Sequence, residues 1–199
     1  MKKSRMAWLA MVALTAVALS SSGCGYNRLQ GLDEEVNAAW SEVQNQFQRR
    51  FDLIPNLVET VKGYATHEQQ TLIAVTEARA KVGQVKVTPD TMSDPAKFQE
   101  YEKAQANLGG ALSRLLVVAE SYPDLKANAN FRDLQAQLEG TENRIAVARG
   151  RYIKAVMEFN KMVRYFPTNL TAQYILHMKT RENFTLTDES VKQAPKVKF

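Results

Sequence analysis

The feature that most constrains this fold is the spacing of its apolar residues, which recur every three or four positions along most of the chain. That spacing places them on one face of an α-helix, whereas a half-buried strand needs alternation at every second position. Val85 and Val87 alternate in that way, but two residues are too few to indicate a sheet. The pattern predicts an all-α protein whose narrow apolar faces must be buried against one another.

The first run predicts one long helix over residues 29–82. Two successive four-residue steps between Val43 and Phe51 resemble a stutter, which favours a straighter helix. Gly63 and the polar residues 66–70 are the points at which this helix could break. The apolar positions of the run are Leu29, Leu32, Val36, Trp40, Val43, Phe47, Phe51, Ile54, Val58, Val61 and Ala65, followed by Leu72, Val75, Ala78 and Val82.

Pro55 lies inside this run and has no N–H for the carbonyl of Phe51, so we expect a kink there. The kink serves packing if it lets the first helix wrap the others. Alternatively, it frees that carbonyl and spreads Arg49, Asp52 and Asn56 into a surface that a partner binds. Both interpretations remain open from the sequence.

A second helix is expected to begin at Asp94-Pro95, an N-cap followed by a first-turn proline. Residues 83–93 contain a glycine and a proline and little periodicity, so they are expected to form the preceding loop. Pro123 bars continuation of the helix. Its apolar positions are Phe98, Tyr101, Leu108, Leu112, Leu115, Leu116 and Ala119.

The third helix has the most regular spacing in the chain. Asn130 with Asp133 resembles a capping box at its start, and Pro167 stops it. A weaker pattern over residues 170–178 predicts a short final helix, and the Lys-rich end after Thr187 is expected to be frayed. The apolar positions are Phe131, Leu134, Leu138, Thr141, Ile145, Ala148, Tyr152, Ala155, Phe159, Met162 and Phe166.

The N-terminus has the layout of an export signal. Residues 2–5 are basic, residues 6–19 are apolar, and residues 20–23 are small and precede Cys24, the one cysteine of the chain. The apolar run is shorter than the roughly 20 residues of a membrane-spanning helix, although an uncleaved anchor that recruits the following serines is the alternative. Ser21-Ser22-Gly23-Cys24 resembles a bacterial lipobox, with Ser21 where that pattern usually has leucine.

The resemblance implies that Cys24 is lipidated and becomes the mature N-terminus. Several acyl chains hold a soluble domain at a bilayer almost permanently, because each buried methylene contributes about 0.8 kcal/mol. Gly25 lacks the retention character of aspartate at that position, which favours the periplasmic face of the outer membrane in a cell with two membranes.

The predicted fold is therefore an antiparallel up-and-down bundle of three long helices plus a short C-terminal helix, behind an N-terminal signal or anchor. We expect a lipoprotein signal peptide over residues 1–23 and a lipid-anchored linker over 24–28. The bundle should occupy residues 29–182 and a C-terminal tail residues 183–199.

Signals of chemistry are sparse. The formal charge of +5 includes the basic leader, so the rest of the chain is close to neutral and carries no nucleic-acid signature. His67 begins a zinc-protease-like pattern but Thr71 replaces its second histidine, and His177 stands in a polar stretch. Carboxylate pairs such as Glu34 and Glu35 point about 100° apart on a helix and indicate no acid/base pair. We expect no enzyme, cofactor or metal site.

Polar residues close to the helical face are the candidate functional positions. Thr141 falls on an apolar position, and Glu142 and Arg149 lie seven residues apart on its flank, where ions usually set register and pairing between helices. A partner-binding surface is the alternative. The remaining candidates of this kind are Arg50, Asn56, Glu120 and Asn143.

Four separated blocks resemble the LemA family: Gly25-Tyr26-Asn27, the stretch from Arg50 to Val58, the stretch from Tyr122 to Asn128, and Thr141-Glu142-Asn143-Arg144-Ile145 with Ala148-Arg149. Ile153 departs from the asparagine common there. The resemblance implies an all-helical bundle carried by a membrane segment or lipid anchor, without an established enzymatic activity.

Two functional classes follow from these observations. One is an envelope scaffold that presents a bundle face to other proteins, and the other is a sensor or carrier that binds a small ligand or lipid between helices. The apolar face is filled by Phe, Leu, Met and Tyr, which favours the scaffold.

Overall fold

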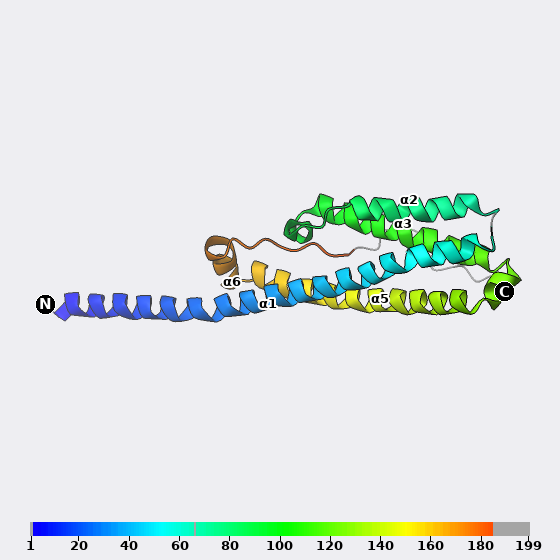
Figure 1. The fold of residues 1–199 in the computed structure, drawn as a ribbon. Helices are drawn as coiled ribbons and strands as arrows, with labels where there is room; N and C mark the ends of the chain where they lie inside the picture. Colours follow the sequence, from blue (N-terminus) through cyan, green and yellow to red (C-terminus); the bar gives the residue numbers. More distant parts are fainter. Residues whose placement is uncertain (1, 66, 185–199) are drawn as a thin grey trace, which may run out of the picture.

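The computed structural model describes residues 2–65 and 67–184, and in these residues all regular structure is helical (Figure 1). Four long helices form the bundle: α1 (Lys2–Lys62), α2 (Gln69–Gln84), α3 (Pro95–Ala119) and α5 (Ala129–Arg164). The shorter elements are η1 (Pro89–Ser93), α4 (Pro123–Ala127), α6 (Thr168–Leu170) and η2 (Thr171–Ile175). The all-α class predicted from the sequence is confirmed.

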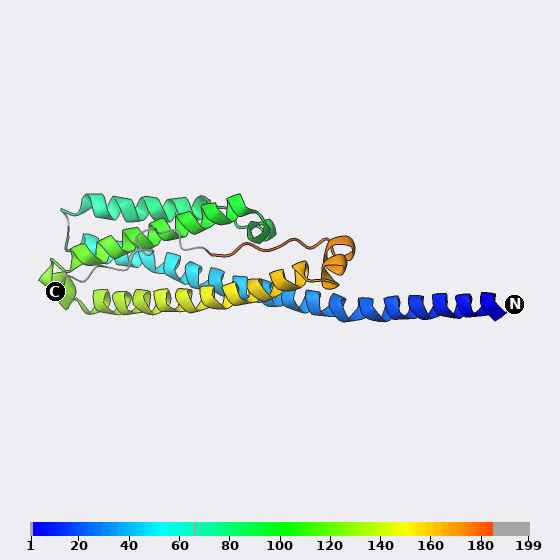
Figure 2. The same ribbon diagram turned by 180° about the vertical axis from the view of Figure 1, so that it is seen from behind.

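The bundle runs up, down, up and down, with α1 packed along α5 and α2 along α3. Figures 1 and 2 show these two pairs as two layers, and the N-terminal part of α1 extends beyond the end of the bundle. None of the described helices combines the length and the hydropathy required to cross a membrane. Residues 24–28, expected as a linker, are part of α1.

The single helix expected over residues 29–82 is wrong, because α1 ends at Lys62 and α2 begins at Gln69. The apolar spacing misled the prediction, since both helices bury side chains in the same core. Tyr64 and Glu68 lie in the turn between α1 and α2. Tyr122 donates to Glu68 Oε1 at 3.1 Å, and Asn128 donates to the Tyr64 hydroxyl at 2.8 Å. The bundle therefore has four long helices instead of three.

Helix ends follow local capping chemistry. Asp94 accepts from the backbone N–H groups of Ala96 and Lys97 at 3.0 and 3.3 Å, which confirms it as the N-cap of α3. The N-cap of α5 is Asn128, two residues before the predicted Asn130, and its side chain accepts from Phe131 N at 3.0 Å.

The stutter expected in the first helix is also wrong. From Val36 to Val61 the buried residues of α1 keep alternating steps of four and three, because the inward positions are Arg50 and Leu57 rather than Phe51 and Val58. This is the heptad spacing of coiled-coil packing. The inward positions of this stretch are Val36, Trp40, Val43, Phe47, Arg50, Ile54, Leu57 and Val61.

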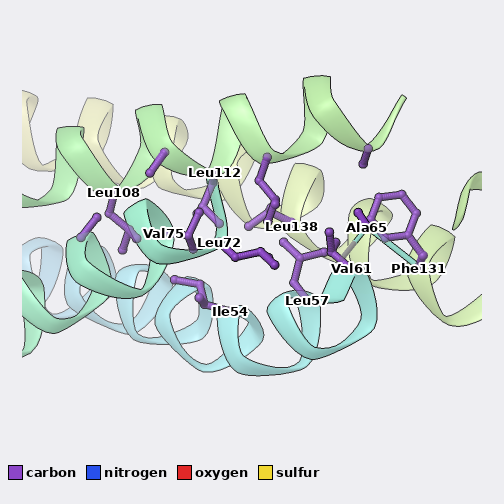
Figure 3. Packing of buried hydrophobic residues seen from close by; sticks show 14 of the residues in the cluster. Ile54, Leu57, Val61, Ala65, Leu72, Val75, Leu108, Leu112, Phe131 and Leu138 are labelled. Atoms are coloured by element: carbon purple, nitrogen blue, oxygen red, sulfur yellow. The ribbon is translucent and has the colours of Figure 1, made fainter. Parts of the chain in front are cut away.

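The core consists of two apolar clusters stacked along the bundle. The cluster farther from the N-terminus gathers side chains from all four long helices (Figure 3), including Leu57, Leu72, Leu112 and Leu138. The other cluster is aromatic. Around Trp40 lie Phe98, Tyr101, Tyr152 and Phe184, with ring centroids 5.3–6.2 Å from the indole.

The segment after η2 is fastened to the bundle. His177 (φ 50°) follows η2, and the chain then runs back along the aromatic cluster. Asn160 holds Arg181 through two hydrogen bonds, and Tyr152 donates to the carbonyl of Glu182 at 2.9 Å. Packing reaches at least Phe184, two residues beyond the predicted bundle boundary at 182, and the tail after Thr187 lies outside the described residues.

Candidate functional site

A layer of polar side chains lies between the two apolar clusters. Arg50 of α1 follows Phe47 of the aromatic cluster and precedes Ile54 of the other. Gln105 takes the same intermediate place on α3, between Tyr101 and Leu108. On α5 the intermediate residues are Thr141 and Glu142. We call Arg50, Gln105, Thr141 and Glu142 the polar layer.

Arg50 joins three helices although only 3% of it is exposed. Its Nη1 donates to Glu142 Oε1 on α5 at 3.0 Å, and its Nη2 donates to Gln105 Oε1 and to the Gln105 carbonyl on α3 at 2.6 and 3.1 Å. The guanidinium carbon also lies 5.0 Å from the Phe47 ring centroid, in cation–π range. The planar fork of arginine suits this bridge, because its two terminal nitrogens point to different partners.

Gly109 of α3 lies next to this guanidinium. A Cβ at Gly109 would lie 3.5 Å from Arg50 Nη1, an ordinary contact distance. Tyr101 lies one turn before Gln105 on α3. Burial raises the pKa of its hydroxyl well above the ordinary value of 10, although a hydrogen bond with Gln105 and the charge of Arg50 act in the opposite direction.

A second ion pair lies beside the polar layer, one turn from Gln105 on α3 and two turns from Glu142 on α5. Arg149 Nη2 of α5 is 3.5 Å from Glu102 Oε1 of α3, and the Arg149 guanidinium stands 4.5 Å from the Phe184 ring centroid. Glu102 is buried, so its charge requires such partners. The two pairs border a cleft of about 580 Å³ whose lining includes Arg50, Glu102, Glu142 and Arg149.

Pro55 has no N–H to donate to the Phe51 carbonyl, and a side chain of α2 donates to that carbonyl instead. Arg79 Nε of α2 donates to the Phe51 carbonyl at 3.4 Å, and the Arg79 guanidinium stacks 4.0 Å over the Phe51 ring. This contact fastens α2 to α1 at the proline. It offsets part of the penalty of an interior proline, and α1 continues without a break.

The structure brings together only some of the predicted polar positions. Arg50, Thr141, Glu142 and Arg149 lie in or beside the polar layer, and the Thr141 hydroxyl donates to the Gln137 carbonyl at 2.7 Å. The others are exposed and lie apart from this layer. Arg49, Asp52, Pro55 and Asn56 lie on exposed parts of α1, Glu120 is the C-cap of α3, and Asn143 lies on the outside of α5.

Glu142 and Arg149 do not pair with each other, since each has a partner on another helix. Glu102, the partner of Arg149, and Gln105, a partner of Arg50, were not among the positions predicted from the sequence. A signal was present: the apolar positions of α3 jump from Tyr101 to Leu108, and Gln105 fills the missing step.

The described residues hold no cluster of three or more His, Cys, Asp or Glu side chains arranged to hold a metal ion. His67 lies in the α1–α2 turn and His177 after η2, and both are exposed. Cys24 lies in the helical N-terminal part of α1.

The fold and its polar layer define a four-helix bundle in which polar side chains join α1, α3 and α5. A family model, the LemA family, matches residues 39–199. The chain therefore belongs to the LemA family, as the four sequence blocks indicated.

Curated relatives agree with this assignment. Protein LemA of Metamycoplasma hominis is 26% identical over 147 residues, covering 74% of this chain and 63% of the relative. Magnetosome protein MamQ 2 of Paramagnetospirillum magneticum is 26% identical over 192 residues, covering 88% of this chain and 69% of the relative. The chain thus spans less than two thirds of the length of the LemA relative, and these names are not those of enzymes.

Proposed function

We propose that this protein is a non-enzymatic lipoprotein of the bacterial cell envelope, anchored through acylated Cys24, whose bundle serves as a scaffold for other proteins. Support for the anchor comes from the order of the N-terminus, in which a basic start, an apolar run and small residues precede Cys24. In a cell with two membranes, Gly25 favours the periplasmic face of the outer membrane.

The observation that carries the scaffold role is an exposed row on α5. Val147 and Met157 are 55% and 44% exposed and Ile153 is 38% exposed. Gly150 lies between them, and a Cβ built there meets nothing within 4 Å. At 100° per residue, these four positions fall on one third of the helix circumference. Single exposed apolar residues are ordinary, but a row along one helix face fits an apolar partner helix.

Photocrosslinking tests this role in the intact protein. p-Benzoylphenylalanine placed at Gly150 should crosslink to a small set of envelope proteins in living cells. Gly31 of α1 is the matched control, because it is also helical and its Cβ would also meet open space. Equal crosslinking at both positions, or none at Gly150, would contradict a scaffold face on α5.

The anchor is tested separately by mass spectrometry of the mature protein. The expected N-terminus is acylated Cys24. An intact protein that begins at Met1 would refute lipidation and leave an uncleaved N-terminal anchor in its place.

A second candidate function is a sensor or carrier of a small ligand, which the cleft beside the polar layer favours. It presents Arg149 and the partly exposed Glu142, whose side chains are 36% and 44% exposed, next to the ring of Phe184. Native mass spectrometry of the full-length protein should then reveal a bound metabolite or lipid. Arg149→Gln should release it, whereas Arg151→Gln, on the exposed side of α5, should retain it. Protein without bound mass, isolated directly from envelope, would rule out this candidate.

A further inference from the structure

The end of the bundle from which the N-terminal part of α1 emerges carries a group of exposed apolar side chains. We call this group the anchor-end patch. Phe166 is 80% exposed, and the other members are 41–69% exposed. The patch comprises Tyr26 of α1, Tyr165 and Phe166 at the end of α5, Leu170 of α6, and Tyr174 and Ile175 of η2.

The patch is attached directly to the helix that bears Cys24. A Cβ at Gly25 would lie only 3.0 Å from Thr168 Cγ2, so α1 and the start of α6 are in close contact one residue after the cysteine. The Thr168 hydroxyl is held by the carbonyls of Met162 and Tyr165 at 2.7 and 2.8 Å. Figures 1 and 2 both place α6 beside the point where α1 leaves the bundle.

The composition of this region suits a bilayer surface. Residues 159–181 contain four Lys or Arg residues and no Asp or Glu. Lys161 and Arg181 are paired with Glu158 and Asp33, so Arg164 and Lys179 supply the additional positive charge. Aromatic side chains are favoured at the headgroup level of a membrane, and basic side chains are attracted to anionic lipids.

The opposite end of the bundle differs. Among the described residues, the large apolar side chains exposed there are Tyr64, Ile73 and Val117, which include one aromatic ring. The anchor-end patch has four aromatic rings. A general surplus of exposed apolar residues would not be concentrated at the end beside Cys24.

We propose that the anchor-end patch rests in the interface of the lipid bilayer and fixes the orientation of the bundle on the membrane. The proposal rests on the proposed membrane attachment at this end of α1, but it holds for an acylated Cys24 and for an uncleaved anchor alike. In both cases α1 meets the bilayer within one residue of the Gly25–Thr168 contact. The occupant is the lipid interface, and a protein partner on this patch is the competing outcome.

The test uses the full-length protein, isolated from cells and reconstituted in vesicles of phosphatidylethanolamine and phosphatidylglycerol. A nitroxide is attached at Tyr174→Cys and, in a separate protein, at Val117→Cys. These positions are matched because the native side chains are 69% and 67% exposed. Relaxation by oxygen and by a water-soluble nickel chelate then reports the depth of each label.

The Tyr174→Cys label should have a several-fold higher ratio of oxygen to nickel accessibility than the Val117→Cys label, as expected for a group in the bilayer interface. Equal ratios at the two positions would overturn the proposal, and so would a Tyr174→Cys label that becomes protected only when other envelope proteins are added.

The failure of the anchor and the failure of the patch give different results. The intact mass reports acylation of Cys24 independently of the label depth. If Cys24 is free, it would itself take the nitroxide, and the measurement is repeated with Cys24→Ser in both proteins. A shallow label on an acylated protein refutes the patch alone, whereas a deep label on an unacylated protein refutes lipidation alone.

Discussion

Replacing Arg50 with lysine tests whether its guanidinium ties the helices of the bundle together. Arg50 donates hydrogen bonds to Glu142 on α5 and to Gln105 on α3 through different nitrogens. Lysine has a single ammonium nitrogen on a flexible stem, so it cannot reproduce the fixed fork in which two separate nitrogens meet the two partners. We expect Arg50→Lys to fold with a lower free energy of unfolding.

The magnitude follows from the burial of the two partners. Gln105 is 7% exposed, and a buried acceptor left without a donor costs about 1–3 kcal/mol. The Glu142 side chain is 44% exposed and can return to water, so its ion pair contributes about 1 kcal/mol or less after screening by solvent. We therefore expect Arg50→Lys to lose about 1–3 kcal/mol. Glu142→Gln should lose less, because its amide oxygen still accepts from Arg50.

The assay is urea unfolding followed by circular dichroism, with Arg49→Lys as the control. Arg49 is the exposed neighbour on the same helix, so its substitution should leave the midpoint unchanged. An Arg50→Lys protein within about 0.5 kcal/mol of the native protein, the usual range of surface substitutions, would refute the bridging role. A larger loss for Glu142→Gln than for Arg50→Lys would show that the ion pair outweighs Gln105.

Three further outcomes are expected. Pro55→Ala should keep or raise the melting temperature, because a helical N–H would again reach the Phe51 carbonyl. Reduced recovery of crosslinked partners with a stable fold would assign the proline to binding. Lower stability with unchanged partners would assign it to packing. Tyr101 and Tyr152 should stay protonated in a spectrophotometric titration through pH 10, because burial raises the pKa of both hydroxyls above the unfolded value of 10. The folded state then binds more protons than the unfolded state, so the free energy of unfolding should fall as pH rises above 10. A free energy of unfolding that does not depend on pH there would contradict their burial. Phe159→Ala should lose roughly 3–5 kcal/mol in urea unfolding, since that ring is fully buried, and a near-zero loss would mean that the core is misplaced.

The helical class and most helix ends were predictable because they depend on local chemistry. The spacing of apolar residues, the N-cap at Asp94 and the proline stop at Pro123 require only neighbouring residues. The turn between α1 and α2 was not predictable from spacing, because Val61, Ala65 and Leu72 keep an apolar pattern through it while the chain reverses direction.

The candidate site was predictable in part for a related reason. Polar residues near the apolar face, such as Arg50 and Glu142, stand out in the sequence. Their partners do not, since the pairing of Arg50 with Gln105 joins residues that are 55 positions apart. Treating Arg50 as a gap in the apolar pattern produced the false stutter. A gap in an otherwise regular heptad is better interpreted as an inward polar residue.

If Cys24 is anchored as proposed, the continuity of α1 sets the heights of its residues above the membrane. At 1.5 Å per residue, Arg50 lies about 39 Å along the helix from Cys24, and Lys62 about 57 Å. With Cys24 held at the bilayer, an upright α1 would fix the distance of each of its residues from the bilayer surface. The polar layer would stand well clear of the lipid headgroups, and the α5 row would be presented to partners at a fixed distance from the surface. Tilting the bundle would lower that distance for every partner at once.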